Sequence, residues 1–117
     1  MAASMLLVMP FAAALTITNN ASIGIDIING GVSLFPAISV RQTVEIGSLR
    51  TFDGEVFATS LAMAANTSVN VDWTMLECRA YIDSAGLWRG SAPFRYNSPA
   101  LLSTNEVEIG SILCYVV

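Results

Sequence analysis

The chain has no lysine and no histidine, and only 12% of its 117 residues are charged, whereas 54% are hydrophobic. A folded monomer of 12.4 kDa exposes roughly 6,100 Å². Its five basic and nine acidic residues therefore leave about 440 Å² of surface for each charge, which is sparse for a globular protein. We predict that other protein covers much of this surface in a permanent assembly.

The same absences exclude most catalytic chemistry. Without histidine or lysine, the commonest general bases and the amine nucleophile are missing, and a serine nucleophile lacks its usual partner. The remaining candidate catalytic groups are the carboxylate pairs Asp53/Glu55 and Asp72/Glu77, which could serve as the two acids of a glycosidase. Acidic pairs at two-residue spacing more simply mark the solvent-facing side of a strand. We predict that the protein is not an enzyme and binds no cofactor.

The charge balance also restricts the partners. The net charge is −4 and the isoelectric point is about 4.4. A protein that binds nucleic-acid phosphates normally carries clustered lysine and arginine, so no nucleic-acid partner is expected. An anionic membrane surface is disfavoured for the same reason.

Cysteine is scarce, with only Cys78 and Cys114, and the residues two positions to either side are apolar: Leu76 and Ala80, and Ile112 and Val116. The favoured interpretation is two buried free thiols. A disulfide between them is the alternative if the chain folds in an oxidising compartment. Two cysteines without histidine supply too few ligands for zinc at motif spacing, so no metal site is expected.

Residues 1–15 form the longest apolar run. A secretory signal needs an early positive charge, but the first basic residue is Arg41. A membrane-spanning helix needs about 20 apolar residues, but Pro10 interrupts this run and Asn19 and Asn20 follow it. We predict an apolar arm or first strand that packs on a neighbour or on its own core. Its predicted contact residues are Met5, Leu6, Leu7, Met9 and Phe11.

Alternation of apolar and polar residues with a period of two recurs along the chain and predicts strands. Residues 22–28 alternate and end at Asn29-Gly30-Gly31, a hairpin signal. Pro36 places the extended stretch 31–40 at a sheet edge or a kink. Further strands are predicted at 43–49, at 55–63 with a short helix as the alternative, and at 106–117. The sequence Val-Glu-Ile-Gly-Ser occurs at 44–48 and 107–111, and Gly47 and Gly110 are predicted bulges.

Residues 67–75 give the clearest predicted strand, with Val69, Val71, Trp73 and Met75 on its core face. The apolar parity then shifts to Leu76, Cys78, Ala80 and Ile82, which predicts a bulge or a change of sheet near Glu77. Residues 84–99 are predicted to be irregular. Short strands between Gly, Asn and Pro turns predict an all-β fold, a jelly-roll-like sandwich of about eight antiparallel strands, in one domain spanning residues 1–117.

Residues 79–96 differ from the rest of the chain in charge. Arg79, Arg89 and Arg95 stand there with one acid, Asp83, giving +2, whereas two arginines and eight acids elsewhere give −6. Arginine and aromatic side chains are enriched at interface hot spots. We predict an oligomer or capsid contact here; the alternatives are a loop that packs Trp88 on its own domain and an aromatic platform for a sugar. The predicted contact residues are Arg79, Tyr81, Trp88, Arg89, Phe94, Arg95 and Tyr96.

A small, acidic, lysine-free, turn-rich β domain with apolar ends at 1–15 and Val116-Val117 resembles the decoration or cement proteins of tailed bacteriophage capsids. This resemblance implies a virion protein on the outer capsid surface. It would bind the major capsid protein lattice as a dimer or trimer and stabilise the shell. The alternative is a carbohydrate-binding or adhesion module of a fibre or pilus that uses Tyr81, Trp88 and Tyr96. A membrane-anchored virion protein, held by the first segment, is the third interpretation.

Overall fold

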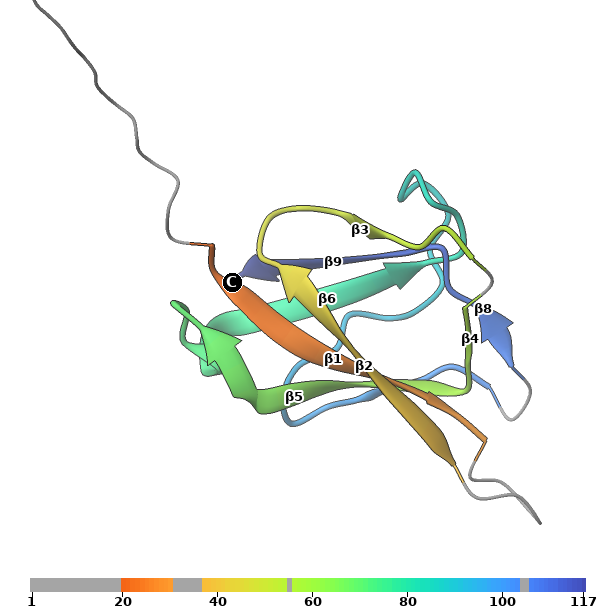
Figure 1. Ribbon diagram of the computed structural model, residues 1–117, viewed down its shortest axis with the longest axis horizontal. Helices are drawn as coiled ribbons and strands as arrows, with labels where there is room; N and C mark the ends of the chain where they lie inside the picture. Colours follow the sequence, from red (N-terminus) through yellow and green to blue (C-terminus); the bar gives the residue numbers. More distant parts are fainter. Residues whose placement is uncertain (1–19, 31–36, 55, 104–105) are drawn as a thin grey trace, which may run out of the picture.

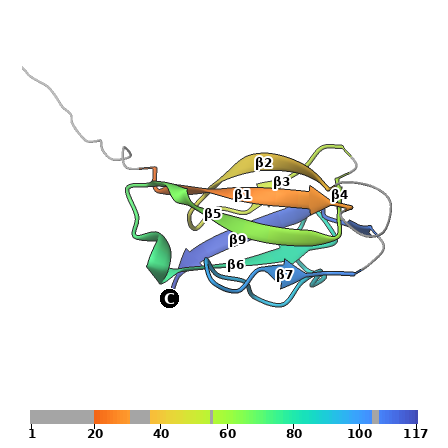
Figure 2. The ribbon, with the colours of Figure 1, turned by 90° about the horizontal axis from the view of Figure 1, so that it is seen from below.

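The protein is an all-β sandwich in the computed structural model, which describes residues 20–30, 37–54, 56–103 and 106–117. Figures 1 and 2 show two layers of strands. One sheet has the order β2-β1-β5-β7, the other has the order β3-β9-β6, and β4 pairs with β8. The sandwich predicted from the turns is confirmed, and its jelly-roll connectivity stays a prediction.

The strands are short and all of their pairings are antiparallel. In chain order, the elements are β1 (Ser22–Asn29), β2 (Ile38–Glu45), β3 (Arg50–Thr51), β4 (Phe57–Ala58), β5 (Ser60–Val69), the 3-10 helix η2 (Trp73–Met75), β6 (Leu76–Tyr81), β7 (Ala100–Leu101), β8 (Val107–Glu108) and β9 (Ser111–Val116).

The core forms where the apolar sides of the two sheets meet. Alternate residues of a strand point to the same side, so three of the four isoleucines of β1 enter the core, and Ile28 lies on the other side. Leu61 and Met63 of β5 join them, and the opposite layer contributes Leu76, Ile112 and their neighbours. The predicted strand at 22–28 is therefore confirmed by β1. The buried β1 residues are Ile23, Ile25 and Ile27.

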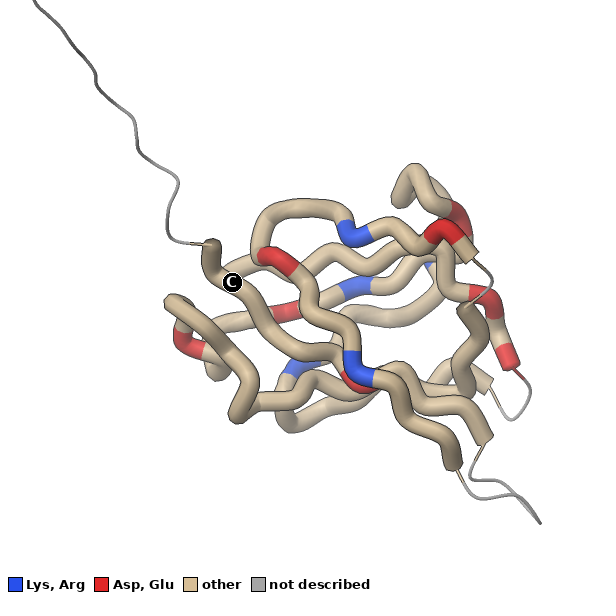
Figure 3. The backbone as a smooth tube through the Cα atoms, in the orientation of Figure 1, with Lys and Arg blue, Asp and Glu red and all other residues tan. Residues whose placement is uncertain are grey.

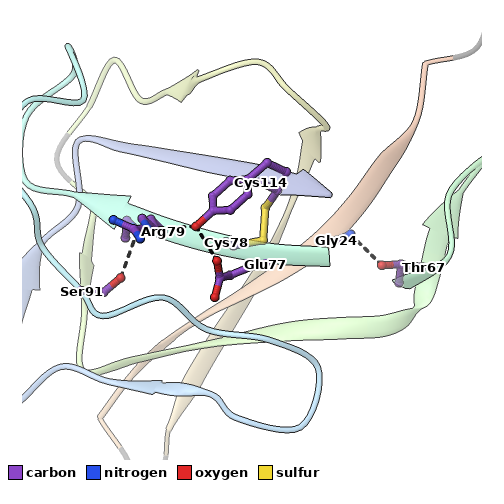
Figure 4. The surroundings of a disulfide bond; sticks show 9 residues. Gly24, Thr67, Glu77, Cys78, Arg79, Ser91 and Cys114 are labelled. Carbon is purple, nitrogen blue, oxygen red and sulfur yellow. Dashed lines mark hydrogen bonds between the residues drawn. A yellow bond between two sulfur atoms is a disulfide. The ribbon is translucent and has the colours of Figure 1, made fainter. Parts of the chain in front are cut away.

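The pairing of β1 with β5 contains a bulge near the beginning of β1. Ser22 pairs with Val69, whereas Gly24 pairs with Ala64, so β5 has three extra residues there. The Thr67 hydroxyl fills the gap: it accepts from the Gly24 N–H at 2.7 Å (Figure 4). It also donates to the Ala64 carbonyl at 2.6 Å. A Cβ on residue 24 would lie 2.6 Å from that hydroxyl, so glycine is needed here.

The strand predicted at 67–75 is wrong beyond Val69. Asn70 has a positive φ of 58°, which asparagine tolerates better than other side chains do. Asp72 then caps η2, because its carboxylate accepts from the Thr74 N–H at 3.0 Å. Val69 and Met75, predicted for the core, are 50% and 47% exposed. The chain crosses between the sheets in this stretch, slightly before the predicted change near Glu77.

Two other predicted strands are shorter than expected. The strand at 43–49 ends with β2 at Glu45, because Gly47 adopts a φ of 84° and its N–H donates to the Cys114 carbonyl at 2.8 Å. The strand at 106–117 is interrupted between β8 and β9. A strand thus ends within each copy of the repeated pentapeptide: β2 ends at Glu45 and β8 ends at Glu108.

Cys78 and Cys114 form a disulfide, so the prediction of two free thiols is wrong. The two residues lie directly opposite each other in the β6–β9 ladder, and their Cα atoms are 4.1 Å apart. Both are fully buried, and Figure 4 shows the sulfur–sulfur bond bridging the two strands. The covalent link holds together the two longest strands of the second sheet.

Candidate interaction surface

The loop after β6, residues 82–90, is held in one conformation by Asp83. Its carboxylate accepts from the Trp88 N–H at 2.9 Å and from the Leu87 N–H at 3.1 Å. The Ile82 N–H donates to the Trp88 carbonyl at 2.8 Å, and Tyr81 bridges to Arg89. These bonds close the base of the loop and fix its backbone.

The loop holds two large apolar side chains in solvent. Leu87 is 78% exposed and Trp88 is 69% exposed, and Arg89 beside them is also exposed. The loop lies at the end of the sandwich away from the beginning of β1 (Figures 1 and 2). Apolar side chains on a fixed loop can bind a partner without first losing backbone entropy.

Gly86 allows the loop to turn. Its φ is 73°, in the left-handed region that glycine adopts without strain. A Cβ there would also lie 3.1 Å from the Leu49 side chain. The order Asp83-Ser84-Ala85-Gly86 matches the preference of a type I turn for Asp first and Gly fourth, so the sequence contains a signal for this turn.

The order of this loop is expected to depend on pH. The Trp88 and Leu87 N–H bonds stabilise the charged carboxylate and hold the pKa of Asp83 below its usual value. Because folding lowers this pKa, the stabilisation is present above the unfolded pKa of about 3.9 and is lost as pH falls through the folded value. In an NMR titration, the Leu87 and Trp88 amide shifts should move with a midpoint below that value. Asp83→Asn keeps an acceptor oxygen but cannot titrate, so the same transition in that variant would contradict the assignment.

Phe94 corrects the predicted interface. It is fully buried, not exposed, because its N–H and C=O both bond to Cys78 at 2.8 and 2.9 Å. This pairing extends β6 by an isolated bridge and turns the ring into the sandwich. Tyr96, two residues on, is 40% exposed and packs edge-on against Trp73, with ring centroids 4.9 Å apart.

Two of the three predicted arginines are occupied within the chain. The Arg79 Nε donates to the Tyr115 hydroxyl at 2.9 Å, and that hydroxyl donates to Glu77 at 2.7 Å. Burial and the bond to Glu77 raise the pKa of Tyr115, so the tyrosine stays a neutral donor. Arg95 donates to the Thr74 carbonyl at 2.9 Å. The predicted basic surface is therefore reduced to Arg89.

Figure 3 shows one group of acidic residues at the end beside β4 and β8, and further acidic residues in the middle and at the other end of the sandwich, so neither sign of charge is confined to one face. Of the predicted contact residues, Trp88 and Arg89 lie together at one tip, beside Leu87. Tyr81 is half-buried. Arg79, Arg95 and Tyr96 lie outside this tip. The predicted arm contacts lie outside the described residues; they are Met5, Leu6, Leu7, Met9 and Phe11.

A second exposed apolar surface was not identified from the sequence. Ile38 and Val40 of β2 are 68% and 51% exposed. They line a groove of about 260 Å³ together with Val56 and Phe57. Figure 1 shows the beginning of β2 diverging from β6 and β9 of the other sheet, in keeping with the exposure of Ile38 and Val40. From the sequence, Pro36 predicted a sheet edge or a kink in the stretch 31–40. It did not predict that the apolar residues Ile38 and Val40 would be exposed.

The chain matches no known protein family, curated protein or solved structure. Within the described ranges, no helix has the length and apolar character needed to cross a membrane. In the same ranges, no three acidic or cysteine side chains gather as candidate metal ligands.

Proposed function

We propose that this protein is a structural assembly module, and that the tip formed by Leu87, Trp88 and Arg89 contacts a larger protein lattice. The observation that carries the proposal is the exposure of Leu87 and Trp88 on a loop whose backbone Asp83 fixes. Tryptophan and arginine are the side chains that most often dominate binding energy at interfaces. A folded chain gains nothing from exposing them unless a partner covers them.

The particular form of the proposal is a capsid decoration protein that binds the major capsid protein as a homo-oligomer. The sparse charge of the chain supports it, because only 12% of the residues are charged and extensive burial against protein then desolvates few charges. The sandwich also suits a passive reinforcing role, since a disulfide and a continuous core keep its shape.

The tip is tested by cosedimentation with empty capsid shells purified from the source virus. Leu87→Ser combined with Trp88→Ala should raise the Kd for the shell at least tenfold, because hot-spot truncations typically cost about 2 kcal/mol or more. Leu101→Ser is the matched control, since Leu101 is 84% exposed at a site outside the loop. Equal binding by both variants would contradict the role of the tip.

Self-association is measured separately by light scattering of the full chain over a dilution series. A dimer or larger species that persists at low concentration supports the assembly module. A monomer at every concentration contradicts it. Binding to immobilised glycans that is lost on Trp88→Ala would favour the adhesion alternative instead.

A further inference from the structure

One edge of the larger sheet turns backbone groups away from its only described neighbour strand. Within the described residues, β2 is the terminal strand of the order β2-β1-β5-β7. The Ile46 N–H donates to the Ala21 carbonyl at 2.8 Å, just past the β1–β2 register. Hydrogen-bonded pairs alternate in an antiparallel ladder. The N–H and C=O groups of Ser39, Arg41 and Thr43 therefore point away from β1.

Within the described residues of β2, the edge lacks the sequence devices that usually block strand addition. Natural edges use lysine, proline, bulges or inward-pointing charges. Within Ile38–Glu45 there is no lysine and no proline, and β2 pairs with β1 without a shift in register. Arg41 is the one basic residue of β2. Its Nε lies 2.8 Å from Asp26 Oδ1 of β1, so its charge is paired with β1 and not placed beyond the edge. An eight-residue edge of this kind is expected to be covered.

The groove under the edge fits one side of an added strand. A strand that continues the sheet past β2 places alternate side chains beside Ile38 and Val40, above Val56 and Phe57. The volume of about 260 Å³ is many times the roughly 30 Å³ that one water occupies. Its occupant should therefore present large apolar side chains with a period of two.

Residues 11–18 of the chain have this pattern. Phe11, Ala13, Leu15 and Ile17 alternate with Ala12, Ala14, Thr16 and Thr18. One side is apolar, and the other carries only alanine and threonine. The segment contains no charge and no proline, and so it has the composition of a strand that adds to an edge.

The segment cannot easily reach the edge of its own domain. Thr18 and Ala21 are separated by three residues, about 10 Å when extended. A strand added beyond β2 would lie two strand spacings from β1, which is about 9.6 Å in a straight line. The link is therefore stretched to its limit before any turn is made. A second copy has no such restriction.

We propose that residues 11–18 of one copy add as a strand to the β2 edge of another copy, with Leu15 and Ile17 in the groove. This inference rests on the proposed self-association and specifies its mechanism. The contact is heterologous, because donor and acceptor surfaces differ. It therefore generates closed rings or chains of subunits.

The acceptor edge is tested with two variants of equal exposure. Val40→Lys places a charge in the groove, whereas Val69→Lys places the same charge at a position outside it. Val40 and Val69 are 51% and 50% exposed, so both variants should fold. By light scattering, the wild type and Val69→Lys should assemble, and Val40→Lys should be a monomer at the same concentration.

The donor segment is tested by residue parity. Leu15→Asp with Ile17→Asp should abolish assembly, because both charges enter the groove. Thr16→Asp with Thr18→Asp adds the same charge on the solvent side and should leave the native mass unchanged. Loss of assembly in both double variants would overturn the alternating contact.

Mixing gives the decisive result. Val40→Lys has an intact donor, and Leu15→Asp/Ile17→Asp has an intact acceptor, so the two monomers together should form a 1:1 heterodimer. No heterodimer would overturn the proposal. A wild-type monomer would contradict self-association itself, whereas an assembled Val40→Lys variant would contradict only the strand addition.

Discussion

Replacing Cys78 and Cys114 with alanine lowers the free energy of unfolding by about 4 kcal/mol in the chain-entropy account. The disulfide closes a loop with a sequence separation of 36, and opening it returns that loop's entropy to the unfolded chain. Urea unfolding measures the loss directly. Thermal unfolding should shift down by roughly 15 °C, since a domain of this size loses several degrees for each kcal/mol.

Two controls separate the covalent link from the packing of the sulfur atoms. The wild-type chain unfolded in excess reductant loses the link but keeps both side chains, so it should be slightly more stable than the double alanine variant. The double serine variant should be the least stable, because both sites are fully buried and a buried hydroxyl without a partner costs about 1–3 kcal/mol. Unchanged stability on reduction would contradict the role of the bond.

The parts of the fold that were predicted correctly are those decided by local pattern. Alternation predicted the strand β1, and in β6 the apolar parity also matched the buried side, Leu76, Cys78 and Ala80, because one side of a strand meets the core and the other meets solvent. The same reasoning failed at 67–75, where the pattern continued but Asn70 and Asp72 formed a turn. Single side chains that bond to nearby backbone outweighed the apolar period there.

The contacts that were not predicted are long-range. The disulfide requires the β6–β9 register, which brings together residues that are 36 apart in sequence. Phe94 and Trp88 are both aromatic and six residues apart, yet one is buried and the other is exposed. The difference arises because Phe94 pairs with Cys78, whereas Trp88 lies on a loop held by Asp83. Composition alone does not distinguish them.

The two exposed apolar surfaces have different roles in the proposed assembly. The tip at Leu87 and Trp88 is small and fixed, which suits an anchor on a larger partner. The β2 edge offers backbone groups and a groove, which suits pairing with an extended segment. Because the tip and the beginning of β1 lie at opposite ends of the sandwich (Figure 2), one copy can contact the lattice while its first segment reaches a neighbour.

Gly110→Ala should destabilise the domain by about 3 kcal/mol, at the upper end of the usual range for an overpacked site. A Cβ at residue 110 would lie 2.8 Å from the Asp83 Cα and closer still to the Ile82 carbonyl oxygen. Both of these atoms belong to the backbone of residues 82–83. Two hydrogen bonds hold that segment against residues 110–111: the Gly110 N–H donates to the Tyr81 carbonyl at 2.8 Å, and the Ser111 hydroxyl donates to the Asp83 carbonyl at 2.7 Å. The added methyl group therefore has to separate the chain segments themselves.

Gly54→Ala is the matched control, because no atom lies within 4 Å of a Cβ there, and its stability should stay within about 0.5 kcal/mol of wild type. Urea unfolding of the two variants gives the comparison. In Gly110→Ala, the Leu87 and Trp88 amide shifts should also move, since Asp83 both packs against residue 110 and caps the loop. Equal stability of the two variants, with an unmoved loop, would show that the backbone at 82–83 has room that the structure does not give it.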